Sequence, residues 1–177
     1  MAIPAGAHKL GPVNGTLWVK TGRTGAAAKA GHDLLMHVTT WEATLEGGEH
    51  PSVVLRADAT SLRVREGTGG MQALGEEDIS NIHQTIDDDV LERTDIEFRS
   101  TEARAEGNRL SVQGELTLRG TTHPLGFDLA VDGGRLTGTA VVKQSDWGMK
   151  PYSALFGTLK VIDAVEVGID AELHPAQ

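Results

Sequence analysis

Strict alternation of apolar and polar residues is the feature that most constrains this chain. It is clearest in DAVEVGIDAEL near the C-terminus, where one face carries Val165, Val167, Ile169, Ala171 and Leu173. Because successive side chains of a strand point to opposite faces, the pattern predicts a strand with one buried and one wet face. Strands of this kind are typical of antiparallel sheets.

The same alternation recurs in NRLSVQGELTLRG and HPLGFDLAVDGG, and glycine-containing turns separate the repeats. Asp132-Gly133-Gly134 is a strong hairpin signal, and Glu106-Gly107-Asn108 and Arg119-Gly120-Thr121 are weaker ones. Eight strands are expected, at about 13–20, 33–46, 51–62, 95–105, 108–119, 122–132, 135–146 and 159–173. The start of the second, LLMHV, is apolar on both faces, so a cover is expected outside Leu34 and Met36.

One segment breaks the alternation. GEEDISNIHQTIDDDVLERTD places Ile79, Ile82, Ile86 and Val90 at helical spacing, which predicts an amphipathic helix over about 76–92. A single helix cannot cover both faces of a parallel sheet, so the remaining choices are a barrel or a sandwich. A barrel of about eight strands leaves room inside for side chains or for one small ligand.

Length and charge limit the classes of function. The chain has 177 residues, which suits a single domain spanning 1–177. Its formal net charge of -9 lacks the basic footprint that nucleic acids require. It has no cysteine, no signal-type apolar segment and no stretch long enough for a transmembrane helix. We therefore expect a cytoplasmic protein that does not bind nucleic acid.

No residue pattern indicates a metal, a cofactor or a catalytic set. His32 and His37 are five apart and would face opposite sides of a strand, while His83 and Asp87 share a helix face without a third ligand. Neither G-x-S-x-G nor H-E-x-x-H occurs. Carboxylates are plentiful, so a paired-acid site stays open, but we expect Asp146 to anchor a turn.

Two stretches resemble a known family. GELTLRGTTHPLGFDL and VVKQSDWGMKPYSALFGTLKV are similar to segments of the YceI-like family of lipocalin-like polyisoprenoid-binding proteins, which are bacterial. The first follows the family pattern G-x-L-T-x-R-G-x-T-x-P, and TDIEFRST resembles the strand before it. The resemblance implies an eight-stranded antiparallel lipocalin-like barrel with a helix beside one end. It also implies an isoprenoid chain, such as a quinone or polyprenyl tail, held inside.

The candidate ligand-binding residues are those that alternation places inside the barrel, with four more from the loop before the last strand. The interior set is Leu17, Leu35, Trp41, Leu45, Leu55, Phe98, Leu116, Phe127, Leu129, Val167 and Ile169. The mouth set is Trp147, Tyr152, Leu155 and Phe156. Alternation alone favours a filled core, whereas the resemblance favours a cavity. We expect Trp41 to limit the length of that cavity.

The leading functional hypothesis is a non-catalytic carrier for an isoprenoid-type lipid. Two alternatives stay open. One is an enzyme of the isomerase or cyclase type that acts on a bound hydrophobic molecule, since fold does not settle function. The other is a module that docks a partner protein through an apolar loop. The sequence also leaves a homodimer open.

Overall fold

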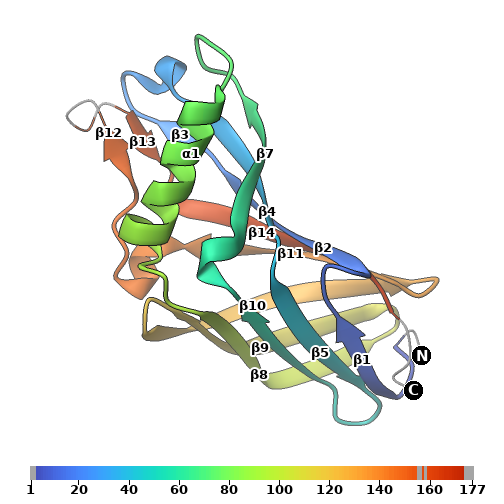
Figure 1. The fold of residues 1–177 in the computed structure, drawn as a ribbon. Coiled ribbons are helices and arrows are strands. Elements are labelled where there is room, and N and C mark those ends of the chain that lie inside the picture. Colours follow the sequence, from blue (N-terminus) through green and yellow to red (C-terminus); the bar gives the residue numbers. More distant parts are fainter. Residues whose placement is uncertain (1–2, 155–156, 158, 174–177) are drawn as a thin grey trace.

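The computed structural model describes residues 3–154, 157 and 159–173. Eleven of the described strands form one antiparallel sheet in the order β1-β5-β6-β8-β9-β10-β11-β14-β2-β4-β7. The sheet curls around an interior, as Figure 1 shows. These strands are β1 (Gly6–Leu10), β2 (Gly15–Thr21), β4 (Asp33–Val38), β5 (Trp41–Gly47), β6 (Ser52–Ala57), β7 (Leu62–Thr68), β8 (Ile96–Glu106), β9 (Arg109–Leu118), β10 (Thr121–Asp132), β11 (Arg135–Lys143) and β14 (Ala164–Glu172). The all-β, barrel-like class expected from the alternation is confirmed.

Shorter elements lie at one end of this sheet. A small second sheet is formed by β3 (Arg23–Thr24), β12 (Ser153–Ala154) and β13 (Leu159–Val161). The helix α1 (Glu76–Thr85) continues into a π-helical turn at Ile86–Val90, which confirms the amphipathic helix. Short 3₁₀ turns occur at Ala28–Ala30, Ala59–Ser61 and Gln144–Trp147.

A bent hairpin joins the two ends of the strand order. One arm of the hairpin consists of β4 and β5, and the other consists of β6 and β7. On one side of the bend β4 pairs with β7, and on the other side β5 pairs with β6, so the two pairs lie toward opposite ends of the strand order. Pairing continues across the bend, because the Thr39 amide donates to the Ser61 carbonyl (2.9 Å) and the Asp58 amide donates to the Thr40 carbonyl (3.0 Å). The strand expected at 33–46 is therefore two strands, and the count of eight is not exact.

Two strands of the large sheet were not expected from the sequence. The segment GAHKL forms β1 and pairs with β5, which places His8 opposite Leu45 and buries it completely. The segment LRVREGT forms β7, where we expected mostly loop. β7 has no large apolar residue after Val64, and β1 is short, so neither strand shows the alternation that marks the longer strands.

The tight turns follow the glycine signals. Gly133 and Gly134 both have positive φ (59° and 82°) and join β10 to β11, where a side chain would be strained. Gly107 (φ 60°) does the same between β8 and β9.

The interior is filled at one end of the barrel and open at the other. Near the turns after β8 and β10, inward side chains such as Leu110, Val112, Val131 and Leu136 have exposed fractions of 0–2%. The opposite end of the barrel lies under α1 and the small sheet (Figure 1). Any site for a molecule inside the barrel must therefore lie toward the α1 end.

Candidate functional site

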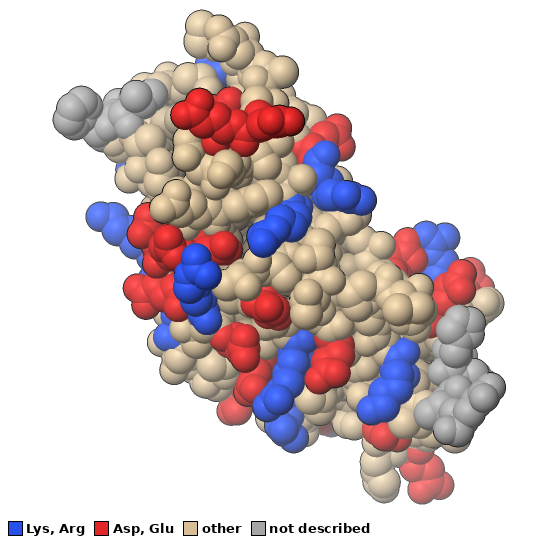
Figure 2. Space-filling model, viewed as in Figure 1, with Lys and Arg blue, Asp and Glu red and all other residues tan. Residues whose placement is uncertain are grey.

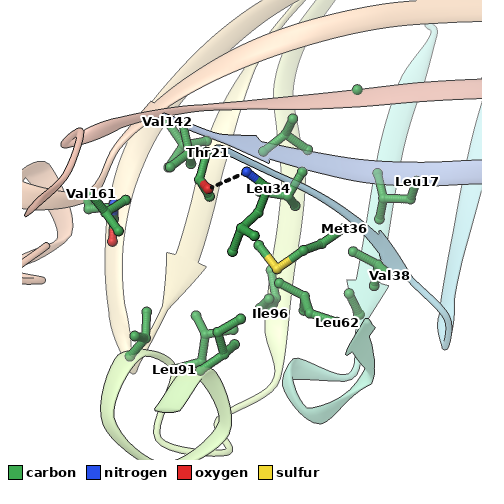
Figure 3. Close-up of a pocket in the computed structure, with 18 of the residues that line it drawn as sticks. Leu17, Thr21, Leu34, Met36, Val38, Leu62, Leu91, Ile96, Val142 and Val161 are labelled. Carbon is green, nitrogen blue, oxygen red and sulfur yellow. Dashed lines mark hydrogen bonds between the residues drawn. The ribbon is translucent and has the colours of Figure 1, made fainter. Parts of the chain in front are cut away.

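A cavity of about 850 Å³ occupies the α1 end of the barrel. Its size falls within the roughly 300–1,000 Å³ typical of small-molecule sites. Aliphatic side chains form most of its wall, and they come from the large sheet, from α1 and from the segment after the π-helical turn. Figure 3 shows Leu34 and Met36 of β4 directed into a space that Leu91 and Ile96 also border.

Several inward side chains of the wall are only partly buried, which distinguishes a cavity from a filled core. Along β10, Leu125 and Phe127 are half-buried whereas Leu129 and Val131 are buried. Along β14, Val167 and Ile169 are half-buried although they face inward. Exposed surface on side chains that face inward means that unfilled space lies beside them.

Most of the interior residues selected by alternation line this cavity. They are Leu17, Leu45, Leu55, Phe98, Leu116, Phe127, Leu129, Val167 and Ile169. Phe98 and Phe127 pack against each other with ring centroids 5.1 Å apart. Their part in binding a ligand stays a prediction.

Leu35 and Trp41 are not among the described residues that line the cavity. Leu35 pairs with Lys20, while its neighbours Leu34 and Met36 line the wall, so the expected phase of this strand was wrong. The run is apolar on both faces, and the pairing of β4 with β7 shifts register between Leu35 and Met36. The cover expected outside Leu34 and Met36 is therefore not required.

Trp41 is 5% exposed, so it is buried, but it lies outside the cavity wall. It begins β5 directly after the bend of the hairpin and pairs with Ala57. Ala43 and Leu45, which follow on the same face of β5, both line the cavity. Trp41 differs from them because it lies at the bend, and periodicity in the sequence cannot locate a bend. The structure therefore gives no support to Trp41 as the residue that limits cavity length.

Two residues of the loop before the last strands have different roles. Trp147 is buried and donates its indole N–H to the Leu116 carbonyl (2.7 Å), and its ring meets His123 edge-on at 5.0 Å. It anchors the loop and does not belong to the described cavity wall. Tyr152, in contrast, lines the cavity and is 50% exposed. The predictions for Leu155 and Phe156 lie outside the described residues.

Several wall residues were missed by sequence reasoning. Met36, Leu62, Leu91 and Val142 all line the cavity, as Figure 3 shows. Val142 lies on the expected strand β11, where correct phasing would have found it, whereas Met36 lies in a run that is apolar on both faces and Leu62 begins the unexpected strand β7. Leu91 follows the helix, and no periodic signal marks it.

Polar groups are concentrated at the mouth. Nε2 of His32 lies 2.6 Å from the carbonyl oxygen of Gln72, which ties the segment after β3 to the loop after β7. Arg23 donates to the carbonyls of Gly31 and Thr68, the latter at 3.3 Å. Acidic side chains gather over the start of α1, where Glu76, Glu77 and Asp78 form the first turn (Figure 2).

The site offers apolar burial and little reactive chemistry. Among the described residues, no three His, Cys, Asp or Glu side chains gather where a metal could bind. His83 of α1 has a lowered pKa, because burial and then Arg63 disfavour its charged form, with Asp87 opposing them. Its Nε2 accepts a hydrogen bond from the Val64 amide (3.0 Å), and this bond attaches α1 to β7.

A curled antiparallel sheet with an apolar cavity and a helix beside its mouth defines a lipocalin-like protein that binds hydrophobic ligands. The chain belongs to the YceI-like domain family, whose model matches residues 23–173. No curated protein sequence matches it significantly. No helix in the described part of the chain combines the length and apolarity needed to span a bilayer.

Solved structures share the fold. Burkholderia cenocepacia BcnA has a TM-score of 0.62 at 15% identity, covering 88% of this chain and 94% of that one. A Campylobacter jejuni YceI protein has a TM-score of 0.56 at 13% identity, and a mutant CJ YceI protein with a monobromobimane guest has 0.59 at 12%. Both of these matches cover 77% of this chain and 82% of the other. At such identities the likeness shows the fold alone.

Proposed function

We propose that the protein is a non-catalytic carrier of an isoprenoid-type lipid, such as a quinone or a prenyl compound, whose tail occupies the cavity. The observation that carries the proposal is the apolar, partly empty interior of about 850 Å³. Each methylene removed from water there stabilises the complex by about 0.8 kcal/mol, so an isoprene unit of five carbons contributes up to about 4 kcal/mol before entropic costs.

The direction of binding follows from the filled end of the barrel. Tight packing around Leu110 and Val131 leaves no space for a chain at that end. The tail therefore points toward this end, and the head group stays near His32, Tyr152 and the start of α1. Polar groups at the mouth suit an amphipathic ligand better than a plain hydrocarbon.

The polar groups at the mouth also favour carriage over catalysis. His32 is hydrogen-bonded to a backbone carbonyl, and Arg23 is committed to two others. General acid–base catalysis needs a titratable group free to reach the substrate. The arrangement thus fits groups that shape the mouth.

Native mass spectrometry of protein purified from its own host, followed by lipid extraction, tests the proposal. We expect a prenyl lipid at close to one per chain. A second arm adds farnesol or a short-chain quinone to delipidated protein. Absence of bound prenyl lipid in both arms would refute the proposal, and conversion of the added compound would show an enzyme.

A further inference from the structure

The cavity has a defined floor. Leu45 of β5, Leu129 of β10 and Leu136 of β11 line the cavity, and each pairs with a residue that is 0–2% exposed and lies outside the described wall: His8, Leu110 and Val131, respectively. We call Leu45, Leu129 and Leu136 the floor. Side chains farther along, Leu110 and Val131 among them, are buried at 0–2% and are not part of the described wall.

The same boundary occurs in three neighbouring strands. Leu136 pairs with Val131 on one side and with Ala171 on the other, and both partners are buried at 2%. Toward the mouth, β14 becomes half-buried at Ile169, two residues from Ala171, and β10 becomes half-buried at Phe127, four residues from Val131. The transition from packed core to open space therefore occurs within two to four residues of this row of pairs.

The volume above the floor limits what can enter. At roughly 30 Å³ for a water-sized group, which is also about the size of a methylene, the cavity holds about 28 such groups. That corresponds to between five and six isoprene units of five carbons each. A longer chain would have to remain partly in water at the mouth, because the packed end cannot take it.

We propose that the cavity imposes an upper chain length of about six isoprene units on its ligand and that the floor residues set this limit. The inference rests on the proposed function, because it concerns the prenyl tail that the cavity would hold. Each unit that enters below the limit should raise affinity by about tenfold or more, and units beyond it should add nothing.

One substitution shortens the cavity without touching the floor. Ala140 of β11 lines the cavity, is half-buried and pairs with Val167 of the neighbouring strand β14. Ala140→Phe would place a ring in the open space, and we expect the limit to fall by about one isoprene unit. Its neighbour Val141 is 64% exposed on the outer face, so Val141→Phe is the matched control.

A second substitution deepens the cavity. Leu136→Ala removes three carbons from the floor, so the limit should rise by about half an isoprene unit, measured as higher affinity for the first prenol beyond the plateau. This variant weakens packing, and a thermal melt must show that it remains folded. If it unfolds, the chain-length profiles of the unmodified protein, of Ala140→Phe and of Val141→Phe still test the proposal.

The measurement is displacement of N-phenyl-1-naphthylamine by all-trans prenols, from farnesol to solanesol in steps of one isoprene unit. We expect affinity to rise and then level off, with the plateau starting earlier in Ala140→Phe and unchanged in Val141→Phe. Affinity that keeps rising to solanesol, or a plateau that Ala140→Phe leaves in place, would overturn the length limit. Failure of every prenol to displace the dye would instead overturn the proposed function.

Discussion

Nε2 of His83 on α1 lies 3.0 Å from the backbone nitrogen of Val64 on β7 and accepts its hydrogen bond. β7 ends the strand order of the described sheet, so this bond covers a backbone group on an otherwise open edge. The adjacent Ile82 and Ile86 line the cavity. The contact therefore joins the helix at the mouth to the barrel wall.

The attachment of α1 should depend on pH. Burial and Arg63 lower the pKa of His83, while Asp87 raises it, and the net direction is downward. The folded protein thus binds fewer protons at this site than the unfolded chain, so stability falls as pH drops below about 6.5. Protonated Nε2 cannot accept from Val64. Because intrinsic amide exchange slows as the pH falls, the quantity to follow is the protection factor. The protection factor of the Val64 amide should fall between pH 8 and pH 5, a range of about 1.5 pH units on either side of the ordinary histidine pKa.

The control for this prediction is a second histidine. His83→Gln should abolish the pH-dependent loss of protection at Val64, whereas His50→Gln, in the turn after β5, should leave it intact. Identical pH profiles in wild type and His83→Gln would contradict the role of this bond.

Gly168 of β14 should not tolerate a side chain. It pairs with Trp18 of β2, and a Cβ at this position would overlap the indole ring. We expect Gly168→Ala to lower the free energy of unfolding by about 1–3 kcal/mol, because the ring must shift in a packed surface. Glu166→Ala, exposed on the same strand, is the control for urea denaturation. Equal midpoints for both variants would disprove the overlap.

Trp147 should matter for stability and not for ligand capacity. Trp147→Phe keeps most of the ring but leaves the buried Leu116 carbonyl without its indole donor. The expected cost is about 1–3 kcal/mol of unfolding free energy. Because Trp147 does not line the described cavity, dye binding per folded molecule should be unchanged. A loss of dye binding without a loss of stability would instead show that Trp147 contributes to the mouth of the cavity.

Tyr152 should show the opposite behaviour. Half of its surface is exposed while it lines the mouth, so Tyr152→Ala removes little packing. Surface changes of this kind usually alter stability by less than about 0.5 kcal/mol. We expect faster release of a bound prenol, measured by stopped-flow dilution, with an unchanged melting temperature. An unchanged release rate would exclude Tyr152 from the exit path.

The sequence by itself determined most of the longer strands, the turns between them and most inward positions. Alternation in β10 and β14 placed Phe127, Leu129, Val167 and Ile169 correctly, because side-chain direction in a strand follows from its period of two. Glycines in the turn sequences located the hairpins, and in the structure these glycines have positive φ. Spacings of three and four identified the helix.

Only the tertiary structure decided where the long hairpin bends and which part of the barrel is empty. The bend after Thr39 separates β4 from β5, removes Trp41 from the wall and changes which positions face inward, from Leu34 and Met36 before it to Leu45 after it. The same inward side chains can fill a narrow barrel or line a wide one. Their burial, complete at Leu136 and partial at Ile169, depends on the curvature of the whole sheet, which no local pattern encodes.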